Sequence, residues 1–259
     1  NIGPLHISIK PRGVTRQTRE WTFMVYLDAA NNLEPYGIED FLEMSSVGSS
    51  SEVAIIVLMD RIAGYDSSYD DWTDTRIFYV DPGEGPNATN ADEIWGEKNM
   101  GDPQTLVDFV AWCISNYPAN HYALILWDHG NGWQGLCWDE DNLNDYLDIY
   151  ELRNALEDIY ASTGEVIDVL GFDACLMGML ELAYACRDYV NYVVFSEALE
   201  PGDGWPYDSI LNDLVKNPSV SSPSLAVLIA QKYIEYYHSI GDESVTQSAV
   251  NVTALVMDL

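Results

Sequence analysis

Residues 166–179 read V-I-D-V-L-G-F-D-A-C-L-M-G-M, an apolar run that leads into a cysteine. Its first five residues are mostly aliphatic or β-branched, which predicts a buried strand. A short break follows, and from Leu176 the apolar residues recur every three or four positions, which predicts a helix. Cys175 is therefore expected at the end of a strand and in the first turn of a helix, where the helix dipole favours the thiolate. The alternative is a small, buried and inert cysteine.

A second apolar stretch, residues 122–128 (Y-A-L-I-L-W-D), predicts another buried strand and runs directly into His129-Gly130. In an open parallel sheet, functional groups collect at the carboxyl ends of the strands. If the two strands are neighbours, the imidazole of His129 and the thiol of Cys175 stand at one edge as base and nucleophile. The backbone N–H groups of Gly130 and Cys175 also follow strand ends, so we expect them to form the oxyanion hole.

The rest of the chain alternates buried strands with helical patterns. This alternation predicts one α/β domain, a three-layer α/β/α sandwich with a mostly parallel central sheet. Strands are expected at 21–28, 53–60, 75–80, 122–128, 166–170, 192–196 and 249–257. Helices are expected at 33–47, 103–117, 149–160, from 176 onward, 206–215 and 224–239, with a long acidic loop at 131–148.

The net charge and the number of cysteines limit which classes of partner, disulfide and metal site we expect. The 259 residues include 42 acidic and 11 basic ones, a net charge of −31 that repels nucleic acid and anionic membranes and attracts cationic ligands. The acidity equally fits a solubility or salt-adaptation trait. Four cysteines without CxxC spacing indicate neither a disulfide framework nor a zinc site. Residues 139–148 resemble a calcium loop only loosely, so a calcium site and a plain solvated loop both stay open.

The two ends of the chain differ from its middle. Residues 1–20 form a basic extension holding four of the eleven basic residues, which are Lys10, Arg12, Arg16 and Arg19. The sequence begins with Asn1, so we expect a leader to have been removed and the protein to be secreted or at the cell surface. It stops within a strand-like pattern, so we expect the full protein to continue beyond Leu259.

The two strand-end motifs, extended to Y-A-L-I-L-W-D-H-G-N-G-W and V-I-D-V-L-G-F-D-A-C-L-M-G-M-L-E-L-A-Y, resemble the clostripain family of cysteine peptidases. The segments W-T-F-M-V-Y-L-D-A-A-N-N-L-E and S-E-A-L-E-P-G-D-G-W-P-Y are similar to it as well, so 21–259 is expected to be its peptidase domain. The resemblance implies a caspase-like fold, related to legumain and gingipains, with His129 as base and Cys175 as nucleophile. It also implies cleavage after Arg or Lys, with Asp173 and Asp203 in the S1 pocket.

These features together predict a monomeric cysteine endopeptidase that acts on peptides with a basic P1 residue, without a cofactor and through an acyl-thioester. Two alternatives are the same scaffold with another P1 preference, such as Asn, and a catalytically silent protein that binds cationic peptides. The alternative roles are a helix N-cap for Asp173 and a turn residue for Asp203. Residues 130–152 hold no Lys or Arg. A peptidase that cleaves after Arg or Lys is therefore not expected to cut itself in this segment. We expect the basic extension to occupy the active site or to be trimmed by it.

Overall fold

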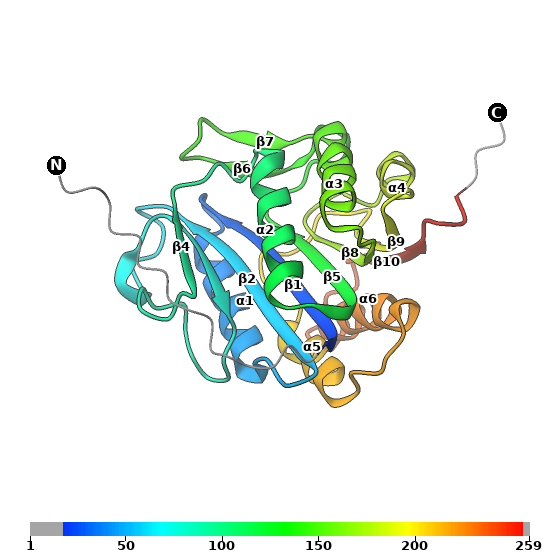
Figure 1. Ribbon diagram of the computed structural model, residues 1–259, viewed down its shortest axis with the longest axis horizontal. Coiled ribbons are helices and arrows are strands. Elements are labelled where there is room, and N and C mark those ends of the chain that lie inside the picture. The colour runs from blue at the N-terminus through cyan, green and yellow to red at the C-terminus, as the bar shows by residue number, and fades with distance from the viewer. Residues whose placement is uncertain (1–17, 256–259) are drawn as a thin grey trace.

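The computed structural model describes residues 18–255 (Figure 1). The strands of the main sheet are β1 (Arg19–Ala29), β2 (Val53–Arg61), β3 (Thr75–Tyr79), β4 (Glu93–Gly96), β5 (Ala119–Trp127), β8 (Ile167–Asp173), β9 (Val190–Phe195) and β10 (Ser248–Asn251). They are ordered β10-β9-β8-β5-β1-β2-β3-β4. β9, β8, β5, β1 and β2 are parallel, while β3, β4 and β10 pair antiparallel at the two edges. The predicted mostly parallel sheet is confirmed.

Helices cover both faces of this sheet. They are α1 (Glu34–Val47), α2 (Pro103–Asn116), α3 (Ile149–Thr163), α4 (Leu180–Cys186), α5 (Tyr207–Lys216) and α6 (Ser222–Ser239). α2, α3 and α4 pack on one face, where α2 and α3 lie in front of the strands in Figure 1, and α1, α5 and α6 pack on the other. Side chains alternate across each strand, so Tyr26 of β1 enters the first core and Leu27 the second. This is the expected three-layer sandwich.

Two helix starts follow from local sequence. The side chain of Asp102 accepts the backbone N–H of Gln104 at 2.9 Å, and Pro103 opens α2 as predicted. α3 begins with a capping box, in which Asp148 accepts the N–H of Glu151 and the Glu151 side chain accepts the N–H of Asp148. No helix among residues 18–255 combines the length and the apolar character that a membrane crossing requires.

Three expectations need correction. The acidic segment 131–148 is not all loop, because it holds the hairpin β6 (Leu136–Asp139) and β7 (Asp145–Leu147). The last strand is shorter than predicted, since β10 ends at Asn251. The first strand begins earlier, at Arg19, whose N–H donates to the carbonyl of Pro118 at 3.1 Å. Residues 1–17 of the expected basic extension lie outside the described residues, as do 256–259.

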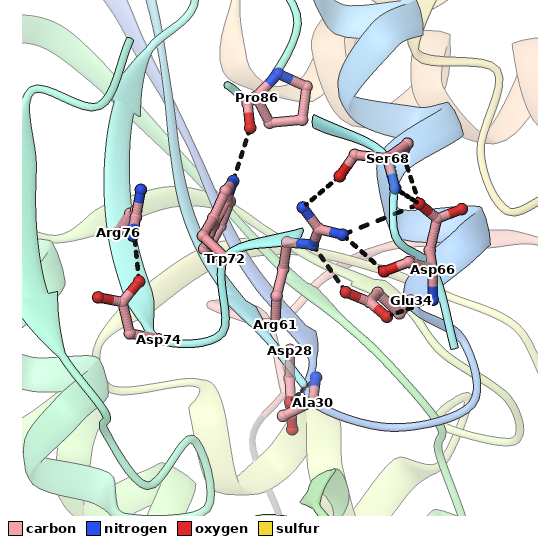
Figure 2. Close-up of polar contacts among 10 residues, drawn as sticks. All are labelled: Asp28, Ala30, Glu34, Arg61, Asp66, Ser68, Trp72, Asp74, Arg76 and Pro86. Atoms are coloured by element: carbon pink, nitrogen blue, oxygen red, sulfur yellow. Dashed lines mark hydrogen bonds and ion pairs between the residues drawn. The ribbon is translucent and has the colours of Figure 1, made fainter. Parts of the chain in front are cut away.

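A buried ion pair joins the sheet to α1 (Figure 2). Nε of Arg61, the last residue of β2, lies 2.7 Å from Oε1 of Glu34, the first residue of α1, and both side chains are fully buried. The guanidinium also donates to the backbone carbonyls of Ser68 at 3.1 Å and Asp66 at 3.0 Å, and it lies over the Trp72 ring. One side chain thus connects β2, α1 and the loop that follows β2.

We expect Arg61→Met to lower the free energy of unfolding by about 3–5 kcal/mol, because it leaves the Glu34 carboxylate buried without its counter-charge. The double variant Arg61→Met/Glu34→Leu removes both charges and should recover most of that loss. Urea unfolding of the three proteins measures both effects. Equal destabilisation by the single and the double variant would contradict this account of the pair.

Candidate active site

The two strand ends that carry the predicted dyad lie side by side. β5 and β8 are adjacent and parallel, with Trp127 and Asp173 as Cα partners at their carboxyl ends. The N–H of Asp128 donates to the carbonyl of Asp173 at 3.3 Å. His129 and Cys175 each follow two residues after the paired Trp127 and Asp173, so both residues leave the same edge of the sheet.

The loops that carry these residues are in backbone contact. A Cβ built on Gly130 would lie 2.2 Å from the carbonyl oxygen of Cys175 and 2.9 Å from its backbone nitrogen. No side chain fits at that position, so glycine is required for the two loops to approach each other. The close approach brings together the backbone of the two residues predicted to form the oxyanion hole.

Cys175 is the accessible thiol among the described cysteines. It is half-buried, whereas Cys113, Cys137 and Cys186 are fully buried. The N–H of Glu200 donates to its Sγ at 3.2 Å, so the sulfur faces a backbone dipole and is not sealed beneath hydrophobic side chains. The Cys175 thiol in turn donates to the carbonyl of Glu200 at 3.7 Å.

The prediction of a helix directly after Cys175 is wrong. α4 begins only at Leu180, with Met179 as its N-cap, so the thiol is not in the first turn of a helix. The intervening segment is held by bonds to the chain after β9: the N–H of Leu176 donates to the carbonyl of Ala198, and that of Gly178 to the carbonyl of Ser196. These tertiary bonds compete with helix formation. The helix N-terminus predicted at Cys175 is therefore absent from that position.

The imidazole of His129 has a partner that the sequence did not indicate. Its Nε2 lies 2.9 Å from Oδ1 of Asn32, which follows the end of β1. An amide oxygen only accepts hydrogen bonds, so Nε2 carries the hydrogen and Nδ1 keeps its lone pair. In the sequence, Asn32 stands out only as part of the turn-like pair Asn31-Asn32. The available signal was its position after a strand, because β1 is the neighbour of β5.

Burial lowers the pKa of His129 below its usual value, and the nearby carboxylate of Glu140 opposes this shift. A general base must be unprotonated to act, so a lowered pKa of His129 extends activity to lower pH. We expect the acidic limb of kcat/KM to have its midpoint below about pH 6.5. Glu140→Gln removes the opposing charge and should move that limb further down, whereas the distant Glu157→Gln should not. A midpoint above pH 6.5, or an upward shift in Glu140→Gln, would contradict this.

Asn32 contacts the imidazole of His129, so its predicted role is to position that ring. We expect Asn32→Ala to lower kcat by roughly 10- to 100-fold with little change in KM, because the imidazole loses its orienting acceptor. Asn32→Asp places a carboxylate against Nε2 and should move the acidic limb upward. Steady-state kinetics across pH separate the two effects. An unchanged kcat in Asn32→Ala, or an unmoved limb in Asn32→Asp, would refute the positioning role.

Asp173 lies in the core between the sheet and α1, α5 and α6. Its Oδ2 accepts the N–H of Trp205 at 3.1 Å and the hydroxyl of Tyr207 at 2.9 Å. Burial raises the pKa of Asp173 to about 6, although hydrogen bonds from Glu200, Tyr207 and Trp205 oppose the shift. Asp173 is not the N-cap of the following helix, because Met179 occupies that position.

Two further carboxyl groups lie beside Asp173, and no sequence pattern indicates either of them. A Cβ on Gly204 would lie 2.9 Å from Oδ2 of Asp40 and 3.1 Å from Oδ2 of Asp173, so these carboxyl groups share one small space. The Glu200 carboxyl lies beside Asp173, with both oxygens buried and without a well-aligned hydrogen-bond partner. Asp203, the other predicted S1 residue, is exposed on the same loop, and its side chain is not buried in this cluster.

Residues 25–257 match the Clostripain family. The chain belongs to that family. Clostripain of Hathewaya histolytica is 32% identical over 222 residues, which cover 74% of this chain and 41% of that protein. The chain therefore spans less than half the length of this clostripain relative. The expected family membership is confirmed.

Solved structures share the fold of this clostripain-family chain. A secreted cysteine protease from Bacteroides thetaiotaomicron, in complex with an irreversible peptide inhibitor, superposes with a TM-score of 0.73 at 23% identity, covering 90% of this chain and 66% of that one. An inactive zymogen protease from Parabacteroides distasonis gives a TM-score of 0.70 at 24% identity, covering 92% and 64%. The TM-scores show a common fold, and at identities below 25% the likeness shows the fold alone.

Proposed function

We propose that this chain is a cysteine endopeptidase that cleaves after Arg or Lys, with Cys175 as nucleophile and His129 as general base. The observation that supports it most is the contact between the two strand-end loops at Gly130 and Cys175, in a chain of the clostripain family. A half-buried imidazole with a free Nδ1 and an accessible thiol on adjoining loops form the parts that acyl transfer requires.

The reaction follows from these groups. Nδ1 of His129 takes the proton of the Cys175 thiol, and Sγ attacks the carbonyl carbon of the scissile bond. The oxyanion that forms accepts the backbone N–H groups of Gly130 and Cys175. When the C–N bond breaks, the imidazolium returns its proton to the leaving amine and a thioester remains. His129 then deprotonates water, which hydrolyses the thioester and releases the acid and the free thiol.

The preference for a basic P1 side chain rests on the buried cluster around Asp173. The Glu200 carboxyl, Nε1 of Trp205 and the hydroxyl of Tyr233 are buried there without well-aligned partners. Buried carboxyl groups favour a cationic guest, because a guanidinium or ammonium supplies both charge and donors. Since the Glu200 N–H contacts Sγ, a P1 residue bound at Cys175 would sit beside this cluster. The net charge of −31 adds long-range attraction for cationic peptides.

Fluorogenic peptides that differ only at P1 test the proposal. We expect kcat/KM for Arg and Lys peptides to exceed that for the Asn peptide by at least about 100-fold, the range that one buried charge pair supplies. A preference for the Asn peptide would be compatible with a cysteine peptidase but would overturn the proposed specificity for Arg and Lys. Binding of the Arg peptide without hydrolysis would identify the silent, peptide-binding alternative.

Three further properties belong to this proposal. Secretion is supported by the structural relative described as secreted, and a monomer remains the expected state. The active chain should stay uncut between residues 130 and 152, which lack Lys and Arg. N-terminal sequencing of active protein that found a new terminus in this range would contradict the last expectation.

A further inference from the structure

One tryptophan differs from all the others in its exposure to solvent. Trp133 is 71% exposed, whereas the other tryptophans are buried or half-buried. It lies on the 3₁₀ turn η2 (Gly132–Gln134), which begins three residues after His129. A tryptophan ring carries a large apolar surface, and exposed rings of this kind are typical of binding surfaces. The position beside the proposed base makes the peptide substrate the first ligand to consider.

A second exposed apolar side chain lies next to Trp133. A Cβ built on Gly132 would lie 3.0 Å from Sδ of Met179 and 3.3 Å from the carbonyl oxygen of Leu176, so η2 rests on the segment that follows Cys175. Leu180, the residue after Met179, is 65% exposed. Trp133 and Leu180 each adjoin one side of this contact. We call Trp133, Met179 and Leu180 the Trp133 patch.

Backbone hydrogen bonds fix the turn that carries Trp133. The N–H of Asn131 donates to the carbonyl of Gly135 at 3.0 Å, and the N–H of Gln134 donates to the carbonyl of Asn131 at 3.2 Å. The N–H of Gly135 donates to the carbonyl of Gly132 at 3.2 Å. Gly132 has a φ of 59°, which glycine adopts without strain. The backbone of Trp133 is therefore held in place before any ligand binds, which lowers the entropic cost of binding.

The proposed chemistry determines which part of a substrate approaches η2. The imidazolium of His129 returns its proton to the leaving amine, so the residue after the scissile bond must lie on the His129 side of Cys175. The P1 residue lies on the other side of the thiol, where the N–H of Glu200 contacts Sγ at 3.2 Å. Trp133 follows His129 by four residues and is thus on the leaving-group side.

The Trp133 patch and the P1 cluster also lie on opposite faces of the sheet. Met179 packs against the core that α2, α3 and α4 cover. Trp205 and Tyr207, which donate to Asp173, belong to the core under α1, α5 and α6. Successive side chains of an extended peptide point in opposite directions. A peptide whose P1 side chain enters the Asp173 cluster therefore directs its next side chain, P1′, toward the face that carries the patch.

We infer that the Trp133 patch binds the P1′ side chain, so that the chain prefers a large aliphatic or aromatic residue directly after the scissile Arg or Lys. This inference rests on the proposed function. An indole ring, a thioether and an isobutyl group offer no charge, so the contact stabilises the complex by burying apolar surface. Glycine at P1′ has no side chain to bury. An acidic P1′ residue is also repelled by the net charge of −31.

Internally quenched peptides that are identical except for Phe, Leu or Gly at P1′ test the inference. We expect kcat/KM of wild type for the Phe and Leu peptides to exceed that for the Gly peptide by roughly 10-fold. In Trp133→Ala this ratio should fall below about threefold. The ratio compares two substrates of one preparation, so a smaller folded fraction does not change it.

Tyr160→Ala is the matched control variant. Tyr160 is 45% exposed and lies near the end of α3, beside the start of β8 and so at the opposite edge of the sheet from Cys175. Its replacement also removes an exposed aromatic ring, yet it should keep the wild-type ratio. Equal ratios in Trp133→Ala and Tyr160→Ala would overturn the inference, as would a wild-type ratio near 1.

Hydrolysis of an N-acyl arginine methyl ester separates this inference from the proposed function. Its leaving group is methanol, so the ester has no P1′ side chain and reports only the nucleophile and the P1 site. If wild type hydrolyses the ester but shows no P1′ preference, the inference fails and the proposed function stands. If it hydrolyses neither the ester nor the peptides, both fail. A dimer in light scattering that dissociates in Trp133→Ala, without any P1′ preference, would assign the patch to a second copy of the chain and overturn the inference.

Discussion

Replacing Cys175 with alanine is expected to lower kcat/KM for Arg and Lys peptides by at least about 10⁴-fold, because covalent catalysis loses its nucleophile. The change removes only a sulfur atom from a half-buried position, and the Gly130 backbone contact does not involve the side chain of Cys175. The variant should therefore fold and still bind the peptide. Progress curves and peptide binding to the same preparation measure the two properties.

Cys113→Ala is the matched control for that experiment. Cys113 is fully buried in α2, so its replacement alters packing in the core and leaves the strand-end loops alone. We expect its activity to stay within about twofold of wild type while its free energy of unfolding falls by about 1 kcal/mol. Activity retained by Cys175→Ala, or lost in Cys113→Ala with an intact fold, would exclude Cys175 as the nucleophile.

The second large effect is expected from Asp173→Asn. The isosteric amide keeps an oxygen for Trp205 and Tyr207 but removes the charge. Loss of one partner of a buried charge pair costs about 3–5 kcal/mol, so kcat/KM for an Arg peptide should fall by roughly 10²- to 10⁴-fold. Burial raises the pKa of Asp173 to about 6, so KM for basic peptides should also rise as the pH falls through that region.

Asp203→Asn separates the two predicted S1 residues. Because Asp203 is exposed, its charge is screened by solvent, and we expect its replacement to change kcat/KM by less than about 10-fold. Urea unfolding of both variants shows whether a loss of activity reflects a loss of fold. If Asp203→Asn is the more damaging of the two, or if Asp173→Asn cleaves the Arg peptide like wild type, the assignment of Asp173 to the P1 side chain is wrong.

Strand periodicity predicted most of the architecture. Continuous apolar runs mark strands that are buried on both faces, and the polar residues directly after them mark the carboxyl edge. This pattern predicts that His129 and Cys175 lie at one edge of the sheet if their strands are neighbours. The register of β5 and β8 then confirms that these strand ends lie side by side.

Features that depend on tertiary contacts were beyond sequence reasoning. The pattern after Cys175 has helical periodicity, yet Leu176 has φ of 64° and its N–H is bonded to Ala198, so the helix starts late. The Asn32 contact and the carboxyl groups around Asp173 join residues from different elements. Single-sequence patterns describe local periodicity and contain no such pairings.

Labelling by an Arg acyloxymethyl ketone probes the nucleophile and the P1 site together, since the reagent needs both an activated thiol and a site for a basic side chain. Mass spectrometry of the digested chain assigns the adduct among the four cysteines. We expect one adduct, on Cys175, that forms much more slowly in His129→Ala and in Asp173→Asn. An adduct on Cys113, Cys137 or Cys186, or an unlabelled chain, would contradict it.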